Sequence, residues 1–191
     1  VVLVANSVVA RNSELGLSEE HVTSTIKRIT GAESVIYLEP LAGEHTGHLD
    51  LFATFTSADT VVIGDSSNTD RSNTEILNRN AQRLSQVRVN GEPLRVVRIP
   101  QPPRAASYFG GSYTNVVYAN GTLLVPTWSS ARKQDEKRVL ETYQRLLPDW
   151  KIVPIESTEL GERGGALRCA TTNFFRLSRS SWLTLQSDSG T

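Results

Sequence analysis

Short runs of β-branched and aromatic residues alternate along this chain with longer segments whose apolar residues recur at helical spacing. The first such run, residues 1–5 together with Val8 and Val9, predicts a buried strand. A helix is predicted to begin after Ser18, because serine is a favoured N-cap residue and two acidic residues follow it. A short strand is predicted next, over residues 34–38.

From residue 49 onward the pattern predicts a unit of two strands, a helix and a third strand. Residues 49–55 and 60–64 are the first two strands, because both are rich in β-branched and aromatic residues. Ser72 and Glu75 have the spacing of a capping box and predict the start of the helix. Residues 94–99 then form the third strand.

The same order of elements is predicted a second time, at residues 113–119, 122–125, 132–147 and 151–155. Asn120 and Gly121 join its first two strands, and this pair is a strong hairpin signal because both residues tolerate a positive φ angle. The charged run at residues 132–138 is expected to be a solvent-exposed face of the helix.

A repeated strand-strand-helix-strand unit buries the faces of its sheet only against neighbouring units. The opening segment has the elements that would end another copy of this unit. We therefore predict an α/β fold in which several ββαβ units form part of a ring. Residues 1–186 are expected to belong to one domain, and residues 187–191 to form a flexible tail.

Composition and charge exclude several classes of partner. The chain has 20 basic and 20 acidic residues, so no long-range field favours nucleic acid or an anionic membrane. No apolar run reaches the roughly 18 residues needed to cross a bilayer. No cofactor is expected. The sequence leaves the compartment open between the cytosol and export.

The beginning of the chain predicts a missing partner. The sequence contains no methionine and opens directly with the predicted strand at residues 1–5. A sheet edge left unpaired there would favour aggregation or pairing with another strand. We expect an upstream segment of the same domain, either covalently attached or held as a cleaved companion chain.

Cys169 is the only cysteine, so it cannot form an internal disulfide bond. Two interpretations remain. A free cysteine is often a small buried hydrophobic residue. It is alternatively a nucleophile, served by a histidine and acids elsewhere in the chain.

His48 and Asp50 are the histidine and acid with the clearest pattern. If residues 49–55 form a strand, the two side chains share one face near its start, which suits proton transfer. A solvated turn at the start of a strand is an equally good interpretation. A metal site made of His45, His48, Asp50 and Glu44 is less favoured, because the segment matches no metal-binding signature.

Three segments in a fixed order resemble the agmatine deiminase and bacterial-type peptidylarginine deiminase family. GHLD at residues 47–50 with FATF at 52–55 resembles the family's GHxDxxAxF motif. YTN at 113–115 and NGTLLVP at 120–126 are similar to its YxN and NGxxLVP segments. GGALRCAT at 164–171 resembles its GGx-hydrophobic-HCxT motif. The resemblance covers nearly the whole chain, but only the C-terminal part of the family's domain.

The resemblance implies a pentein fold, in which five ββαβ units surround a central channel. It implies that Cys169 is the nucleophile, His48 the general acid and base, and Asp50 a substrate carboxylate, and it aligns Glu44 with a further acid near the substrate. The implied reaction is hydrolysis of a small-molecule or peptidyl guanidine such as agmatine or peptidyl-arginine, through an S-linked intermediate, with release of ammonia. The alternatives are an amidinotransferase or dimethylarginine hydrolase of the same fold, or a non-catalytic binding or assembly module.

Arg168 departs from the family motif, which has histidine before the cysteine. If this segment is a strand, Arg168 points away from the substrate, because neighbouring strand residues face opposite sides. The tryptophans, Trp128, Trp150 and Trp182, are expected to anchor the core or an interface rather than to bind substrate.

Overall fold

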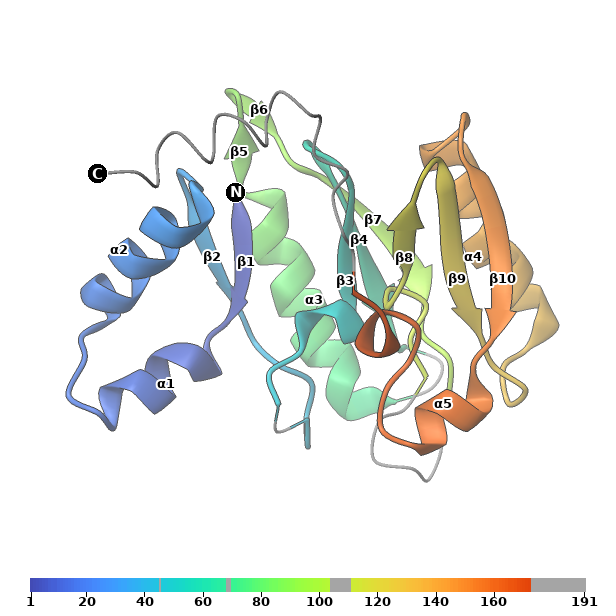
Figure 1. The fold of residues 1–191 in the computed structure, drawn as a ribbon, viewed down its shortest axis with the longest axis horizontal. Helices are drawn as coiled ribbons and strands as arrows, with labels where there is room; N and C mark the ends of the chain where they lie inside the picture. Colours follow the sequence, from blue (N-terminus) through green and yellow to red (C-terminus); the bar gives the residue numbers. More distant parts are fainter. Residues whose placement is uncertain (45, 68–69, 104–110, 173–191) are drawn as a thin grey trace, which may run out of the picture.

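The predicted repeat is present in the computed structural model, which describes residues 1–44, 46–67, 70–103 and 111–172. The predicted tail at residues 187–191 lies outside these ranges and stays a prediction. The described part is an α/β structure made of several small sheets (Figure 1).

The middle unit confirms the predicted order of strand, strand, helix and strand. Strands β3 (Ala53–Ser57) and β4 (Thr60–Asp65) pair in antiparallel fashion. Helix α3 (Arg71–Ser85) then returns the chain to β7 (Arg95–Pro100), which pairs parallel with β4. A small hairpin of β5 (Arg88–Val89) and β6 (Glu92–Pro93) turns at Asn90, and it lies between α3 and β7.

The C-terminal unit repeats this topology. Strands β8 (Val117–Ala119) and β9 (Thr122–Thr127) are antiparallel, and β10 (Lys151–Glu156) pairs parallel with β9 after helix α4 (Lys133–Leu146). Asn120 at the β8–β9 turn has a φ of 48°, as the hairpin signal required. Strand β8 is shorter than predicted, because residues 113–116 lie before it in irregular structure.

The N-terminal unit has two parallel strands, β1 (Val2–Ala5) and β2 (Val35–Leu38). Between them lie α1 (Ser7–Ser13) and α2 (Glu19–Thr30). This is the pattern of β4, α3 and β7, so the opening segment is equivalent to the end of another unit.

The strand predicted at Val8 and Val9 is wrong, because both residues lie in α1. The N–H of Val9 bonds to the carbonyl of Asn6, so the chain turns into a helix directly after β1. β-branched residues disfavour helix only weakly, and the surrounding structure overrides that preference. The cap of α2 is confirmed, since Oγ of Ser18 accepts a hydrogen bond from the N–H of His21 at 3.2 Å.

The start of α3 also differs from the prediction. Asp70 is the N-cap, and its carboxylate accepts hydrogen bonds from the backbone N–H groups of Ser72 and Asn73. Ser72 is therefore a helical residue and not the cap. Aspartate is as good a cap as serine, and its carboxylate also complements the positive end of the helix dipole.

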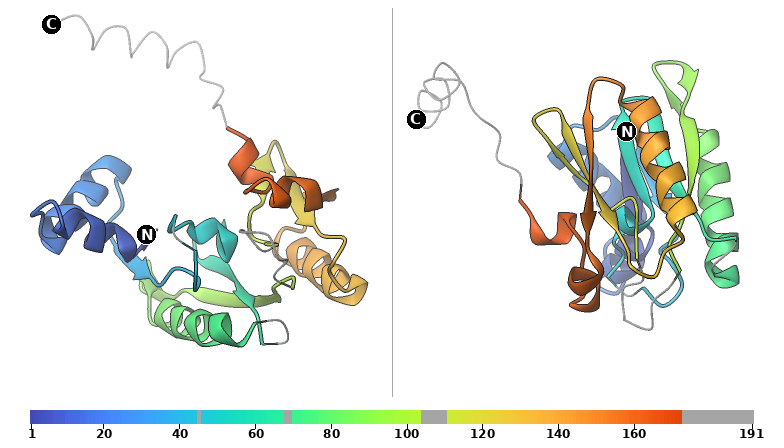
Figure 2. Two further views of the ribbon diagram at one scale, coloured as in Figure 1. Left: turned by 90° about the horizontal axis from the view of Figure 1, so that it is seen from below. Right: turned by 90° about the vertical axis from the view of Figure 1, so that its right-hand side faces the viewer.

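The units share their cores. The alternating residues of β4 separate: Val61 and Ile63 pack with α3 of their own unit, whereas Val62 belongs to the apolar cluster around α4 of the next unit. Ile99 of β7 joins that same cluster. Figure 2 (left) shows the three units side by side along an arc, with α3 and α4 on its outer side. Each unit is thus buried against its neighbour, as the repeat predicted.

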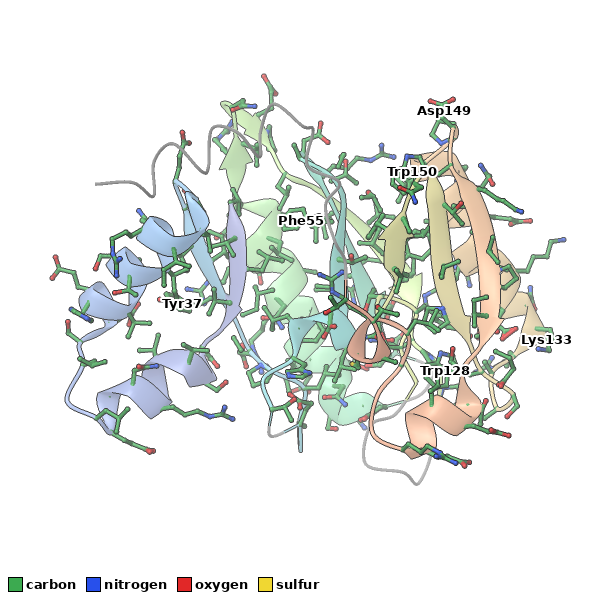
Figure 3. All side chains as sticks on the ribbon, in the orientation of Figure 1. Tyr37, Phe55, Trp128, Lys133, Asp149 and Trp150 are labelled. Atoms are coloured by element: carbon green, nitrogen blue, oxygen red, sulfur yellow. The ribbon has the colours of Figure 1, made fainter. Side chains whose placement is uncertain are left out.

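Two of the tryptophans anchor the core as expected. Trp128 is buried near α5 (Thr158–Glu162), and its indole N–H donates to the carbonyl of Ser112 at 3.2 Å (Figure 3). Trp150 packs edge-on against Tyr118, with ring centroids 5.7 Å apart. Trp182 lies outside the described residues.

The charged run at the start of α4 faces solvent in part only. Lys133 and Lys137 are well exposed, but Glu136 is buried and accepts a hydrogen bond from the backbone N–H of Trp128 at 3.3 Å. In the described ranges, no helix has the length and apolar character required to cross a membrane.

Candidate active site

The segment around Asp50 is a short turn rather than the start of a strand. Residues Leu49–Leu51 form the 3-10 helix η1, and β3 begins only at Ala53. Leu51 of η1 and Phe52, which follows it, are both buried. The prediction that His48 and Asp50 share one strand face is therefore wrong, although both stay at this turn.

Neighbouring segments hold the Asp50 turn in place. The hydroxyl of Thr114 donates to the backbone carbonyl of Asp50 at 2.9 Å, and Nε2 of Gln101 donates to the carbonyl of Leu51 at 3.0 Å. Gln101 lies directly on Gly64, where a Cβ atom would come within 2.5 Å of its Nε2. The turn is thus fixed by the end of β7 and by the segment that precedes β8.

Asn115 joins Asp50 to Cys169. Its side chain is fully buried at 0 % exposure. Nδ2 donates to Oδ2 of Asp50 at 2.8 Å and lies 3.4 Å from Sγ of Cys169. Oδ1 accepts the backbone N–H of Arg168 at 2.9 Å. The amide therefore uses its donors and its acceptor to fix the carboxylate, the sulfur and the backbone beside the sulfur.

Cys169 lies in the 3-10 helix η2 (Arg168–Ala170), so the predicted strand here is wrong. Buried Ala166 and Leu167 anchor the turn, and the cysteine itself is exposed. The interpretation of Cys169 as a buried hydrophobic residue is therefore wrong as well. A Cβ atom at Gly165 would lie 2.7 Å from Cβ of Cys169, so glycine is needed there for the turn to approach this closely.

Arg168 lies beside Asp50 rather than on the opposite side. Its Nε is 4.0 Å from Oδ2 of Asp50, and the two side chains are 53 % and 29 % exposed. The prediction that Arg168 points away assumed the alternating geometry of a strand, which η2 does not have.

Glu44 organises the loop before η1. Its Oε1 accepts the N–H and the hydroxyl of Thr46, and its Oε2 accepts the N–H groups of Gly47 and His48 at 2.6 and 3.1 Å. Burial alone would raise the pKa of Glu44, but these hydrogen bonds outweigh burial and lower the pKa below its ordinary value. Both carboxylate oxygens are therefore engaged by the loop, and a contact with substrate stays a prediction.

His48 is exposed and directly precedes η1. Its backbone is fixed by Glu44, whereas its ring forms no hydrogen bond with any residue that the structure describes. His45 lies outside the described residues, so the metal site that would include it is not tested. Among the residues described, no cluster of three or more histidine, cysteine or acidic side chains could hold a metal ion.

Sequence reasoning missed the role of Asn115, although its motif was recognised. The available signal was its position, between two apolar residues, Tyr113 and Val116, and next to Thr114. A polar amide in an apolar segment is buried only when its hydrogen bonds are satisfied. The partners themselves lie 65 and 54 residues away, which no local pattern indicates.

Comparisons with known proteins show the family to which this repeated α/β fold belongs. Residues 1–174 match the family described as Porphyromonas-type peptidyl-arginine deiminase. The chain belongs to this family.

The relatives and solved structures that this chain matches are named as agmatine or arginine deiminases. A Latilactobacillus sakei protein described as a candidate agmatine deiminase is 26 % identical over 179 residues, which are 81 % of this chain and 48 % of that protein. A Porphyromonas gingivalis protein, solved as a candidate arginine deiminase, is 28 % identical with a TM-score of 0.79, and the match covers 90 % of this chain and 52 % of that one. The agmatine deiminase of C. jejuni has the same fold, with a TM-score of 0.78 at 21 % identity over 93 % of this chain and 52 % of that one. The chain thus spans about half the length of the relatives that it matches.

Proposed function

We propose that this chain carries the nucleophile of a guanidino-group deiminase, a hydrolase that acts on agmatine or on peptidyl-arginine. The observation that carries the proposal is the bridge made by Asn115, whose amide nitrogen lies 2.8 Å from Oδ2 of Asp50 and 3.4 Å from Sγ of Cys169. A carboxylate and a sulfur that share one donor are close enough to contact the same small planar group.

A guanidinium is planar and cationic, so it binds to carboxylates that accept paired N–H bonds in its plane. Asp50 is the carboxylate that we assign to this task. Its Oδ1 takes no hydrogen bond from the residues that the structure describes and is available to a ligand. Asn115 faces the sulfur with an N–H donor, which suits a thiolate because a thiolate accepts hydrogen bonds and cannot donate them.

The thiolate of Cys169 attacks the central carbon of the guanidinium and forms a carbon–sulfur bond. His48 gives a proton to one departing nitrogen, the carbon–nitrogen bond breaks, and ammonia leaves. His48 then takes a proton from a water molecule, which attacks the same carbon and displaces the sulfur. The products are a ureido compound, ammonia and the free enzyme, so one water is consumed for each guanidino group.

We also propose how the rest of the fold completes the site. The three units along the arc support a closed ring of five, with the site at its centre, as in a pentein fold. The chain spans about half the length of its relatives, with 48 % coverage of the Latilactobacillus sakei protein. This coverage supports a further segment, attached or held as a companion, which completes the ring and adds carboxylates for the guanidinium.

An amidinotransferase, a dimethylarginine hydrolase and a non-catalytic binding module are the alternatives, and they are not favoured. The relatives and solved structures described above carry deiminase names. The exposed sulfur with an N–H donor beside it also favours a reactive thiol over a purely structural role.

The test is release of ammonia and of a ureido product from agmatine, from arginine and from a peptide that contains arginine. The intact protein should act on at least one of them, and Cys169→Ser should abolish turnover while retaining substrate binding. Asp50→Asn should raise KM, because a neutral amide does not balance the charge of the guanidinium. An active Cys169→Ser variant would disprove the mechanism.

A further inference from the structure

Helix α3 carries two buried asparagines on the face that meets the segment after β2. Asn73 and Asn80 are 6 % and 2 % exposed, and seven positions along a helix bring two side chains to nearly the same face. Asparagine is a poor residue for a helix interior, and a buried amide is tolerated only when its hydrogen bonds are satisfied. The two side chains are therefore expected to have partners outside the helix.

Asn80 binds the backbone at the start of the segment after β2. Its Oδ1 accepts the N–H of Glu39 at 2.9 Å, and its Nδ2 donates to the carbonyl of the same residue at 2.8 Å. One amide thus satisfies both backbone groups of one residue, as a neighbouring strand would. The chain therefore leaves β2 along a path that α3 determines.

Asn73 binds the same segment three residues further on. Its Oδ1 accepts the N–H of Ala42 at 2.8 Å, while its Nδ2 donates to Oδ2 of Asp70, the N-cap of α3, at 2.7 Å. The bond to Asp70 fixes the plane of the amide, so its oxygen has one orientation. Ala42 is thereby held against the first turn of α3.

Hydrogen bonds continue from this anchor to His48. The carbonyl of Leu41 accepts the N–H of Glu44 at 3.0 Å, and Oε2 of Glu44 accepts the N–H groups of Gly47 and His48. Asn73 is thus the point at which the loop that carries His48 is attached to a helix.

The location of the His48 ring is set through its backbone, because the ring forms no hydrogen bond with the residues that the structure describes. A general acid or base must come within about 2.6–3.2 Å of the atom that gives or takes the proton. A displacement of about 1 Å can slow a reaction roughly 10²-fold. The attachment to α3 therefore matters for proton transfer, since it fixes the backbone from which the imidazole projects.

We propose that Asn73 is a positioning residue for His48, which acts on the rate of proton transfer and not on binding of the guanidine. The inference rests on the proposed function, since it takes His48 as the general acid and base. It divides the site into two independently held parts. Asn115 holds Asp50 and Cys169, whereas α3 holds the His48 loop through Asn73.

The test is a double-mutant cycle of Asn73→Ala and His48→Ala, measured as kcat for the guanidine that the intact protein turns over. With His48 present, Asn73→Ala should lower kcat about ten- to hundredfold. In His48→Ala the same change should lower the remaining rate less than about twofold, because the group that Asn73 positions is gone. The Kd of the guanidine for Cys169→Ser should likewise change less than about twofold on Asn73→Ala. Asn78→Ala, at an exposed asparagine of the same helix, is the matched control and should leave kcat unchanged.

Hydrogen exchange at single backbone amides tests the attachment without turnover. Asn73→Ala should speed exchange of the N–H groups of Gly47 and His48 at least about threefold more than that of Leu123 in β9, which reports general destabilisation. If Asn73→Ala does not fold, Asn73→Ser takes its place, because its hydroxyl can still donate to Asp70 but does not reach Ala42.

The outcomes separate this inference from the proposed function. An equal loss of kcat from Asn73→Ala with and without His48, or equal acceleration of exchange at all three amides, would overturn the inference alone. Absent turnover in the intact protein, or normal activity of His48→Ala, would overturn the proposed mechanism. Exchange at Gly47 and His48 then decides whether Asn73 holds the loop.

Discussion

Nδ2 of Asn115 lies 3.4 Å from Sγ of Cys169, although the two residues are 54 positions apart in the chain. The same nitrogen bonds to Oδ2 of Asp50, which precedes Asn115 by 65 positions. One buried amide thus sets the distance between the nucleophile and the carboxylate that we assign to the substrate.

Asn115→Ala should lower both stability and activity. The change leaves the N–H of Arg168 and a carboxylate oxygen of Asp50 without their partner, which costs about 1–3 kcal/mol in the free energy of unfolding. Urea denaturation measures this cost, and kcat/KM measures the loss of positioning. Asn78→Ala is the control, because exposed Asn78 only accepts a hydrogen bond from Arg98, and its effect should stay within about 0.5 kcal/mol. Equal effects of the two changes would contradict this role of Asn115.

Cys169 should react with chloroacetamidine faster than with neutral chloroacetamide at pH 7. The amidine is a cation with the shape of a guanidinium, so Asp50 should hold it beside the sulfur, whereas the neutral reagent gains no such attraction. Mass spectrometry of the alkylated protein gives both rates. The advantage of the amidine should disappear in Asp50→Asn and after denaturation. If it persists in Asp50→Asn, the carboxylate does not bind the cation.

His48→Ala should lower kcat by roughly 10²–10⁴-fold, the range typical of lost general acid–base catalysis. KM should change less, because the mechanism assigns His48 to proton transfer and not to binding. His21→Ala is the matched control, since His21 is an exposed histidine on α2 and should have normal kinetics. Normal activity of His48→Ala would remove His48 from the mechanism.

The lowered pKa of Glu44 predicts that the free energy of unfolding falls at acid pH. Its pKa is lower in the folded protein than the value of about 4.3 for an unperturbed glutamate, so folding favours the ionised form. The stabilisation is present above the unfolded pKa and is lost as pH falls through the lower, folded pKa.

Unfolding free energies of the wild type and of Glu44→Gln should therefore differ at pH 6 and converge towards pH 3. Glu44→Gln should also lower kcat, because the backbone N–H of His48 loses a carboxylate oxygen. Parallel pH curves for the two proteins would show that the loop does not depend on this carboxylate.

The sequence predicted the repeated units because their signals are local. The Asn120-Gly121 turn, the cap at Ser18 and the apolar stripe of α4 each lie within a few residues of the element that they specify. Parallel pairing of β4 with β7 then follows from the helical crossover between them. Local signals also singled out Cys169, His48 and Asp50 as candidates, whose roles stay a prediction.

The turns of the site could not be predicted in the same way. The segments at Asp50 and Cys169 contain apolar residues that suit a strand, and they become 3-10 turns because distant groups bond to their backbones. The position of Arg168 depends on this geometry, so the strand assumption placed it on the wrong side. The family resemblance placed Glu44 near the substrate, whereas its hydrogen bonds to the loop are seen only in the structure.

The shared cores have a consequence for how activity appears during folding. Val62 and Ile99 of the middle unit are part of the apolar cluster of the C-terminal unit, so neither unit completes its interior before the two dock. Asp50 belongs to the middle unit, whereas Asn115 and Cys169 belong to the C-terminal unit. In a partly folded chain Cys169 therefore lies away from Asp50. The thiol can favour cationic reagents only after the two units have docked. The rate at which Cys169 becomes reactive towards a cationic reagent would therefore report the rate at which the two units dock.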